Sequence, residues 1–383
     1  MSRFLRFPRS LSNLKKKAST TIERLYWSRF KDKDVLDVAF ITSGGVGDML
    51  MFLNYIKHFV EWADCRVRAD YFHNAKMIAN LHSFDDENWL HGCYDRDDVW
   101  RLRGKYDLIL EFRFRYPRVI HMRHRRVKYL SRKIPVLADK YLEFEDKNRD
   151  LIDYSPKTDG LTCDIARIQG DTRLTQPDLY DLLSIQKFCI NIPIKKEAES
   201  LSRFDLVDSQ YVLVNRSVDS SRSGAESTKL WPKDHYHELI TLIKEQYPQS
   251  VIVMCGPHLD DYDYGDVLDL RGKTSFNDLL VLIRNAKLLI CPEGGMAHLR
   301  AALHAGKSCV LFGPTSIKFY GYKSNINLTR SEECIEHCEW IKGNWQECCI
   351  KNGTGCCNKL LKLTAEDVLK AISPELESIY GRG

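Results

Sequence analysis

The chain has 383 residues, of which 44% are hydrophobic and 28% charged, and its formal net charge is +5. The length predicts two or three domains, and the composition is typical of a globular protein that buries a sizeable core. The sequence holds no apolar run of about 18 to 20 residues, which excludes a membrane-spanning helix. The charged N-terminus lacks the apolar stretch of a secretory signal, so we expect a cytoplasmic protein.

Positive charge is concentrated in two blocks. Residues 1–33 hold ten lysines and arginines against two acids, and residues 113–133 hold nine against none. Such blocks attract phosphate groups or an anionic membrane leaflet, so we expect a basic N-terminal arm over residues 1–34 and peripheral contact with the inner face of a membrane. The alternative is that both blocks are solvated basic surface.

After the arm, residues 35–42 read as a buried strand that ends in a glycine turn. A helix is predicted over residues 48–62, because Leu50, Leu53, Ile56 and Val60 recur at spacings of three and four. Further strands are expected at residues 65–72 and 106–112, whereas residues 140–200 show no clear pattern.

A second alternating series starts near residue 211. Strands are predicted at 211–215, 251–255, 288–291 and 309–312, and helices at 234–247, 276–285 and 295–304. Short alternation of strand and helix favours a parallel sheet covered on both faces, so each series predicts a doubly wound, Rossmann-like domain. We expect these domains over residues 35–204 and 205–330, followed by a cysteine-rich loop (331–358) and a last helix and tail (359–383).

The first candidate motif is the turn from Gly44 to Asp48, where a strand meets a helix. Gly45 and Gly47 allow a ligand to approach the backbone, and the helix N-terminus offers free N–H groups. A dinucleotide fingerprint would have a third glycine where Leu50 stands, which argues against NAD. Asp48 is a candidate general base, with a helix-capping role as the alternative.

The second candidate motif runs from Cys291 to Leu299, where a strand ends, two glycines form a turn and a helix begins. Such an N-terminus suits a diphosphate, so its binding residues are predicted to be Gly294, Gly295, Met296, Ala297 and His298. Glu293 would repel phosphate and is better suited to accept hydrogen bonds from sugar hydroxyls. The alternative for His298 is a buried core position.

Two further segments precede predicted helices. The segment Lys229-Leu230-Trp231-Pro232 places a lysine where it would neutralise a diphosphate, unless that lysine is merely solvated. The segment from Arg271 to Ser275 offers another phosphate or base contact through Thr274.

Together these segments resemble the family of ADP-heptose:lipopolysaccharide heptosyltransferases, glycosyltransferase family 9, which includes relatives that modify autotransporter proteins. The resemblance rests on the glycine–acid turn at 45–48, the Lys-x-Trp-Pro segment at 229–232, the Gly-Lys-Thr-Ser segment at 272–275, and the signature at 293–304 with Phe-Gly-Pro-Thr at 312–315. It spans residues 35 to about 370 and is dense only in 205–316. Glu293 replaces the family's aspartate, and no acid directly follows Gly256, so Asp260 or Asp261 is the candidate for holding a ribose.

The resemblance implies the GT-B fold, two facing Rossmann-like domains with a C-terminal helix, from Thr364 onward, that crosses back to the first domain. It implies inverting transfer without a catalytic metal, from a nucleotide sugar such as ADP-heptose to an acceptor held by the first domain. Asp48 would then be the base, and Lys229 would stabilise the departing diphosphate. We expect the acceptor at Gly45, Gly47, Arg113 and Arg115, and the basic block there predicts an anionic glycan or glycolipid.

Six of the thirteen cysteines crowd into residues 334–357, a glycine-containing loop with little apolar periodicity; they are Cys334, Cys338, Cys348, Cys349, Cys356 and Cys357. Four thiolates from such a loop would hold zinc or iron tetrahedrally as a structural site, and the resemblance to autotransporter-modifying relatives, which carry cysteine-bound iron, favours this. Disulfides, free thiols and a redox role remain alternatives.

The main hypothesis is a glycosyltransferase that acts on lipopolysaccharide core or another surface glycan. One alternative is a glycosyltransferase with a protein acceptor such as an autotransporter. Another is a non-catalytic protein that binds nucleotides or nucleic acid. Because the basic blocks lack the interleaved stacking aromatics of RNA-binding motifs, nucleic acid is not an expected partner.

Overall fold

The computed structural model describes residues 32–74, 89–112, 117–148, 172–218, 227–257, 260–330, 334, 338, 346–349 and 351–381. The basic arm up to residue 31, Arg113 and Arg115 lie outside these ranges. In the described part, no helix has the length and apolar character needed to cross a membrane.

The first domain is built on a five-stranded sheet. Its strands, in the order β3-β2-β1-β4-β5, are β3 (Leu90–Asp95), β2 (Arg66–His73), β1 (Val35–Ile41), β4 (Leu108–Glu111) and β5 (Arg118–Met122). Its helices are α2 (Val46–Trp62), α4 (Asp98–Leu102), the 3-10 turn η1 (Arg103–Lys105), α5 (His124–Leu130) and α6 (Lys133–Lys147). Every side chain of the central strand β1 is buried, because α2 and α6 cover one face of the sheet and α4 the other.

The second domain holds a six-stranded, all-parallel sheet in the order β11-β10-β9-β6-β7-β8. The strands are β6 (Tyr211–Asn215), β7 (Val251–Cys255), β8 (Leu268–Asp269), β9 (Leu288–Pro292), β10 (Ser308–Leu311) and β11 (Ile326–Leu328). The helices of this domain are α9 (Glu197–Arg203), α10 (Lys233–Gln246), α11 (Phe276–Asn285), α12 (Gly295–Ala302), α13 (Ile317–Tyr320), α14 (Asn358–Lys362) and α15 (Ala365–Tyr380). The 3-10 turn η2 (Leu179–Asp181) belongs to the segment that joins the two domains. The predicted α/β class with two Rossmann-like domains is confirmed.

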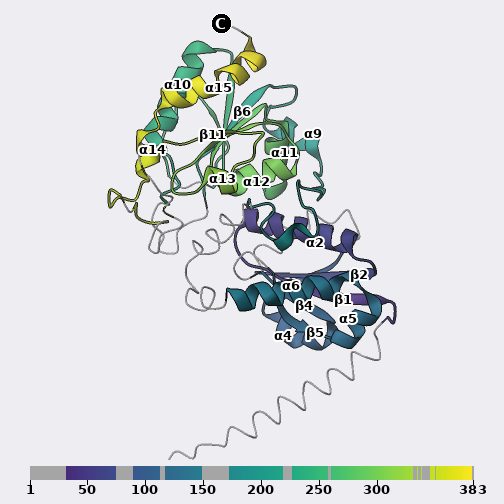
Figure 1. The fold of residues 1–383 in the computed structure, drawn as a ribbon. Coiled ribbons are helices and arrows are strands. Elements are labelled where there is room, and N and C mark those ends of the chain that lie inside the picture. Colours follow the sequence, from purple (N-terminus) through teal and green to yellow (C-terminus); the bar gives the residue numbers. More distant parts are fainter. Residues whose placement is uncertain are drawn as a thin grey trace, which may run out of the picture.

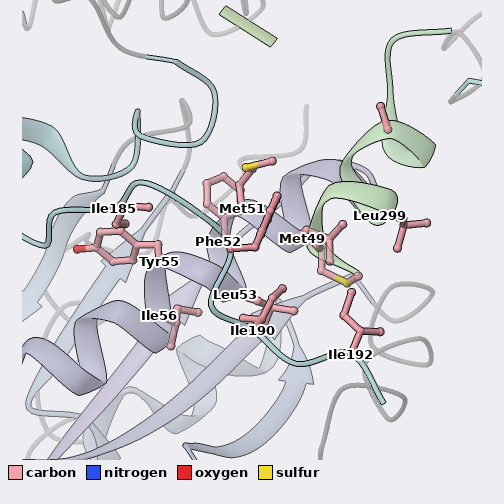
Figure 2. Close-up of a cluster of buried hydrophobic side chains, with 14 of the residues drawn as sticks. Met49, Met51, Phe52, Leu53, Tyr55, Ile56, Ile185, Ile190, Ile192 and Leu299 are labelled. Carbon is pink, nitrogen blue, oxygen red and sulfur yellow. The ribbon is translucent and has the colours of Figure 1, made fainter. Parts of the chain in front are cut away.

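The two domains meet at helices α2 and α12, with α12 and α13 at the end of the second domain nearest the first (Figure 1). The side chains of α2 point toward the connecting segment that carries Ile190 and Ile192, and toward Leu299 of α12 (Figure 2). The core cluster is continuous from Phe40 on β1 through α2 to Leu289 on β9. The junction is therefore buried apolar surface, which fixes the position of the polar groups at its rim.

The last helix does not cross to the first domain, which corrects the arrangement that the family resemblance implied. Helix α15 lies beside α10 (Figure 1), and its apolar stripe of Val368, Ile372 and Leu376 is buried in the core of the second domain. The hydroxyl of Tyr380 donates to the backbone oxygen of Val251 at 3.3 Å. The apolar stripe thus completes the covering of the second sheet on the face shared with α10.

Helix α9 packs on the second domain, although the sequence predicts that the first domain extends to residue 204. The hydroxyl of Ser200 donates to Asp278 of α11 at 2.8 Å, and Asn285 donates to Glu197 at 2.7 Å.

The basic block at 113–133 does not form one uniform surface in its described part. Strand β5 within it pairs antiparallel with β4 at the sheet edge. Arg118 forms an ion pair with Glu145 of α6, while Arg123 and Arg126 both lie beside Asp107, just before β4. These arginines stabilise the first domain itself. Arg123 and Arg126 also lie at the amino edge of the parallel strands, away from the edge where ligands bind such sheets.

Candidate functional site

Asp48 lies in the first turn of α2, directly after the turn that ends β1. Gly44 has φ +114°, and a side chain there would collide with the Asp48 carboxylate, so glycine is required. The N–H of Gly45, the N-cap residue, donates to Asp48 Oδ2 at 3.2 Å. The capping role considered for Asp48 is therefore real, yet its side chain is still 22% exposed and reaches solvent at the rim of the junction.

Arg173 forms an ion pair with Asp48, a contact that no sequence motif predicts. Its guanidinium is 3% exposed, donates to Asp48 Oδ1 and also donates to Gln176 Oε1 at 3.0 Å. Its backbone N–H donates to the oxygen of Phe319 on α13 at 2.7 Å. Arg173 thereby ties the carboxylate of the first domain to the second domain and compensates its charge.

Glu293 and Lys229 form a second ion pair, at the carboxyl end of β9. Lys229 Nζ lies 2.6 Å from Glu293 Oε2, and the Glu293 side chain is 5% exposed. Burial alone would raise the pKa of Glu293, but the charge and hydrogen bond of Lys229, helped by His298 and Thr315, hold that pKa below its usual value. Glu293 is therefore an ionised, buried carboxylate, and Lys229 is its counter-ion in this structure.

His298 links the two ion pairs. Its Nδ1 lies 2.6 Å from the hydroxyl of Tyr322. Burial lowers its pKa to about 4, Arg173 and Lys229 act in the same direction, and Glu293 and Asp48 oppose them. The imidazole is thus neutral at pH 7 and within electrostatic reach of all four charged side chains.

The N-termini of α2 and α12 approach each other closely at this point. A Cβ on Gly47 would lie 2.5 Å from His298 Cδ2, and one on Gly295 would lie 3.5 Å from Val46 Cβ. The N–H groups of Gly295, Met296 and Ala297 precede the first acceptor-bonded turn of α12, so they are available to a ligand. Two helix N-termini that converge at one site favour an anion there.

Two other predicted contacts lie elsewhere on the carboxyl edge of the second sheet. Thr274 is half-buried in the turn before α11, whose N-cap is Ser275. Asp260 has Lys233 Nζ at 2.9 Å, Arg271 Nη1 at 3.1 Å and Arg216 Nη1 at 3.5 Å. Since three cations already hold this carboxylate, Asp260 neutralises them and is a poor candidate for holding a ribose hydroxyl.

A cavity of about 590 Å³ lies beside the Lys-x-Trp-Pro segment. It is lined by Trp231, Lys233, Arg216 and, from the cysteine-rich loop, Thr354 and Cys356, among others. None of the residues around the Asp48 and Glu293 ion pairs lines it, so it is separate from the junction site.

The six cysteines of the cysteine-rich loop differ in burial. Cys338, Cys349 and Cys357 are buried, whereas Cys334, Cys348 and Cys356 are half-buried. Burial raises the pKa of the Cys357 thiol to about 12, and the Cys349 and Cys338 thiols add to this effect, which places these three within electrostatic reach of one another. Three soft donors from one loop fit a zinc or iron centre in kind. Among the described residues they do not all lie within 4.8 Å of one another, so an ion would have to draw them together.

The structure thus brings together six predicted side-chain and backbone contributors, Asp48, Gly47, Lys229, Glu293, Gly295 and His298. It adds Arg173, Tyr322 and Thr315, which sequence reasoning missed. Arg173 lies in a stretch without periodicity, far in sequence from every motif, and no local signal marks it. Thr315 belongs to the Phe-Gly-Pro-Thr segment of the family signature, which could have identified it.

Comparisons with known proteins agree with this architecture. Residues 186–343 match the family model described as glycosyltransferase family 9 (heptosyltransferase). Lipopolysaccharide heptosyltransferase 1 of Campylobacter coli is 27% identical over 114 residues, which are 27% of this chain and 33% of that protein, so the match spans about a third of the curated relative.

Two solved structures share the fold. The E. coli ADP-heptose lipopolysaccharide heptosyltransferase II has a TM-score of 0.54 at 16% identity, covering 90% of this chain and 99% of its own. The dodecameric iron-containing heptosyltransferase TibC, from enterotoxigenic E. coli and solved with ADP-D-beta-D-heptose, has a TM-score of 0.56 at 12% identity, covering 91% and 78%. The resemblance predicted from the sequence is confirmed, and it is carried by residues 186–343, which match the glycosyltransferase family 9 model.

Proposed function

We propose that this chain is an inverting glycosyltransferase that transfers heptose or a related sugar from a nucleotide diphosphate donor, ADP-heptose in the first instance, to lipopolysaccharide core or another surface glycan. The observation that carries the proposal is the junction site. There the carboxylate of Asp48 from the first domain, which is 22% exposed, faces the amide-rich N-terminus of α12 in the region that matches the family 9 model. The cleft between two such domains is where a donor and an acceptor would meet.

In this proposal Asp48 accepts the proton of the acceptor hydroxyl as that oxygen attacks the anomeric carbon. Arg173 and the N–H of Gly45 each donate to one oxygen of this carboxylate, and these two bonds orient it. Arg173 acts as a positioning residue, because its buried guanidinium holds the Asp48 carboxylate in place. General-base catalysis of this kind contributes about 10²–10⁴-fold.

As the new bond forms, the bond from the anomeric carbon to the diphosphate breaks on the opposite face, which inverts the centre. The negative charge that develops on the departing diphosphate is stabilised by the amides of Gly295, Met296 and Ala297 and by Lys229. The ammonium of Lys229 then interacts with two anions, the diphosphate and the carboxylate of Glu293. Glu293 accepts hydrogen bonds from donor sugar hydroxyls through its remaining lone pairs. No step needs a catalytic metal.

On the acceptor side, we assign the backbone of Gly45 and Gly47 to contact with the glycan. Arg113 and Arg115, which follow β4 in the sequence, are the cations proposed for its anionic groups. Arg123 and Arg126 are excluded from this role by their pairing with Asp107. Buried reduced thiols such as Cys255, Cys291 and Cys309 support a cytoplasmic location, with peripheral membrane contact through the basic arm.

A protein acceptor is the second candidate. The fold similarity to TibC, an iron-containing heptosyltransferase, and the three buried thiols Cys338, Cys349 and Cys357 favour it. In that case a structural zinc or iron centre would order the loop. Nucleic-acid binding without catalysis is the weakest candidate, since three of the basic residues at 117–133 are engaged by acids.

The experiment incubates the protein with ADP-heptose and, separately, with truncated lipopolysaccharide or a candidate protein acceptor. Mass spectrometry follows heptose addition, and a coupled assay follows ADP. We expect acceptor-dependent ADP release with an acceptor that gains one heptose. Release with the protein acceptor alone would select the second candidate. Tight binding of oligonucleotides without nucleotide-sugar turnover would contradict both.

A further inference from the structure

We propose that His58, Glu61 and Cys189 form a three-ligand site for a divalent transition metal of the zinc class, at the contact between α2 and the connecting segment. One ligand atom from each, the His58 imidazole nitrogen, a Glu61 carboxylate oxygen and the Cys189 sulfur, lies within 4.8 Å of the other two. A bound ion at 2.0–2.3 Å would hold its ligand atoms roughly 3.3 to 3.8 Å apart, so small side-chain rotations close the group on it.

The backbone brings these residues together independently of any ion. His58 and Glu61 are three residues apart on α2 and therefore share a face, which Asn54 also shares one turn earlier. Asn54 is buried; it accepts from the N–H of Cys189 at 2.7 Å and donates to the oxygen of Lys187 at 3.1 Å. This clamp sets the position of Cys189 opposite His58.

His58 carries the second observation. Its Nε2 atom is buried and has no hydrogen-bond partner among the described residues. A buried ring nitrogen without a partner is unfavourable, and a metal is one of the few groups that would satisfy it there. Glu61, in contrast, is exposed and leaves a path by which an ion can enter.

The donor set selects the metal class. One imidazole nitrogen, one thiolate and one carboxylate suit a borderline ion such as Zn²⁺ or Co²⁺ rather than Mg²⁺ or Ca²⁺, which prefer oxygen. Three protein ligands leave a fourth position for water. On binding, the Cys189 thiol gives up its proton to solvent and its sulfur bonds to the ion.

Such a site would fasten the connecting segment to α2, whose N-terminus carries Asp48. It is distinct from the cysteine-rich loop, which follows the second domain in the sequence. Its occupancy would therefore influence how the connecting segment is held against the first domain, without entering the transfer chemistry.

The test measures alkylation of individual cysteines in the full-length protein by N-ethylmaleimide, with and without micromolar Zn²⁺. Peptide mass spectrometry resolves Cys189 from all others. We expect Zn²⁺ to slow alkylation of Cys189 at least tenfold and to leave Cys65, a half-buried thiol near the end of α2, unchanged. His58→Ala and Glu61→Gln should each abolish or strongly weaken this protection. Glu245→Gln, at an exposed position on α10, should leave it intact.

Because Glu61 is exposed, Glu61→Gln keeps the fold and separates loss of a ligand from loss of structure. A Zn²⁺-dependent rise in melting temperature that disappears in Glu61→Gln would support the site further. Protection of Cys189 that is equal in the wild type and in both ligand variants would overturn the proposal, as would alkylation of Cys189 that Zn²⁺ does not slow.

Discussion

Removing the charge of Lys229 should destabilise the second domain as well as weaken donor binding. Glu293 is 5% exposed and its carboxylate has Lys229 Nζ at 2.6 Å, so Lys229→Met leaves a buried charge without its counter-ion. Breaking a buried ion pair typically costs 3–5 kcal/mol. Because Lys229 is 19% exposed, and the pair is therefore partly screened by solvent, we expect the lower end, about 3 kcal/mol.

Calorimetry is the assay, since a two-domain chain is not expected to unfold in one step. For a domain of this size, 1 kcal/mol shifts the melting temperature by roughly 2–4 °C, so the transition of the second domain should fall by about 6–12 °C. Glu293→Gln should cost less, because it leaves an ammonium that reaches solvent. The double variant should be more stable than the sum of the single effects predicts, by at least about 1 kcal/mol.

The pH dependence of the free energy of unfolding tests the same ion pair between Lys229 and Glu293. The pKa of Glu293 is held below its usual value in the folded protein, so the pair stabilises the fold above the ordinary glutamate pKa and loses this effect as the pH falls through the depressed one. In Lys229→Met that dependence should disappear. Strictly additive single effects, or a shift in melting temperature below about 2 °C with unchanged ADP affinity, would refute the reasoning.

Three further predictions concern other parts of the account. Gly47→Ala should lower turnover at least tenfold, because its Cβ would lie 2.5 Å from His298. The control Gly355→Ala, whose Cβ would have its nearest neighbour 3.9 Å away, should match the wild type. Equal rates for the two variants would show that α2 and α12 need not approach closely. Burial lowers the pKa of His298 to about 4, so the free energy of unfolding should be unaffected by titration of this residue above about pH 6.5 and should fall by on the order of 3 kcal/mol as the pH drops to about 4. Unfolding free energies of the wild type and His298→Asn across this range check it, and parallel pH profiles would contradict it. In protein whose site at His58, Glu61 and Cys189 is removed by His58→Ala, elemental analysis should find about one zinc or iron per chain, and this metal should be lost when cysteines of 334–357 are replaced by serine. Metal-free, active protein with six titratable thiols there would refute the metal.

The local parts of the fold could be predicted because their signals are local. The buried strands β1 and β6, and the helix starting after Ser275, follow from apolar runs and a capping residue within a few positions. The turn that places Asp48 also follows, since Gly44 adopts a positive φ that few other residues accept.

The long-range parts could not be predicted for a physical reason. Arg173 meets Asp48 across 125 residues of chain, and nothing near either residue encodes that contact. The stripe of Val368 and Ile372 predicts an amphipathic helix, yet periodicity does not say which sheet the stripe covers. The expected crossing of this helix came from the family resemblance alone, and here it was wrong.

The charges of the basic block misled in a similar way. A run of arginines in the sequence reads as a ligand-binding surface, but Arg118, Arg123 and Arg126 find acids on other elements. Composition counts the charges and cannot assign their partners, because those partners are distant in sequence.

The central claim is that Asp48 acts as the base at the junction of the two domains. The most direct test measures ADP release and heptose transfer at saturating ADP-heptose for the wild type, Asp48→Asn and the control Asp139→Asn at an exposed position on α6, together with ADP affinity. We predict turnover that falls by about 10²–10⁴-fold in Asp48→Asn alone, with ADP affinity within a few-fold of the wild type. Turnover in Asp48→Asn equal to that of the wild type would show that Asp48 only caps its helix, and would contradict the account.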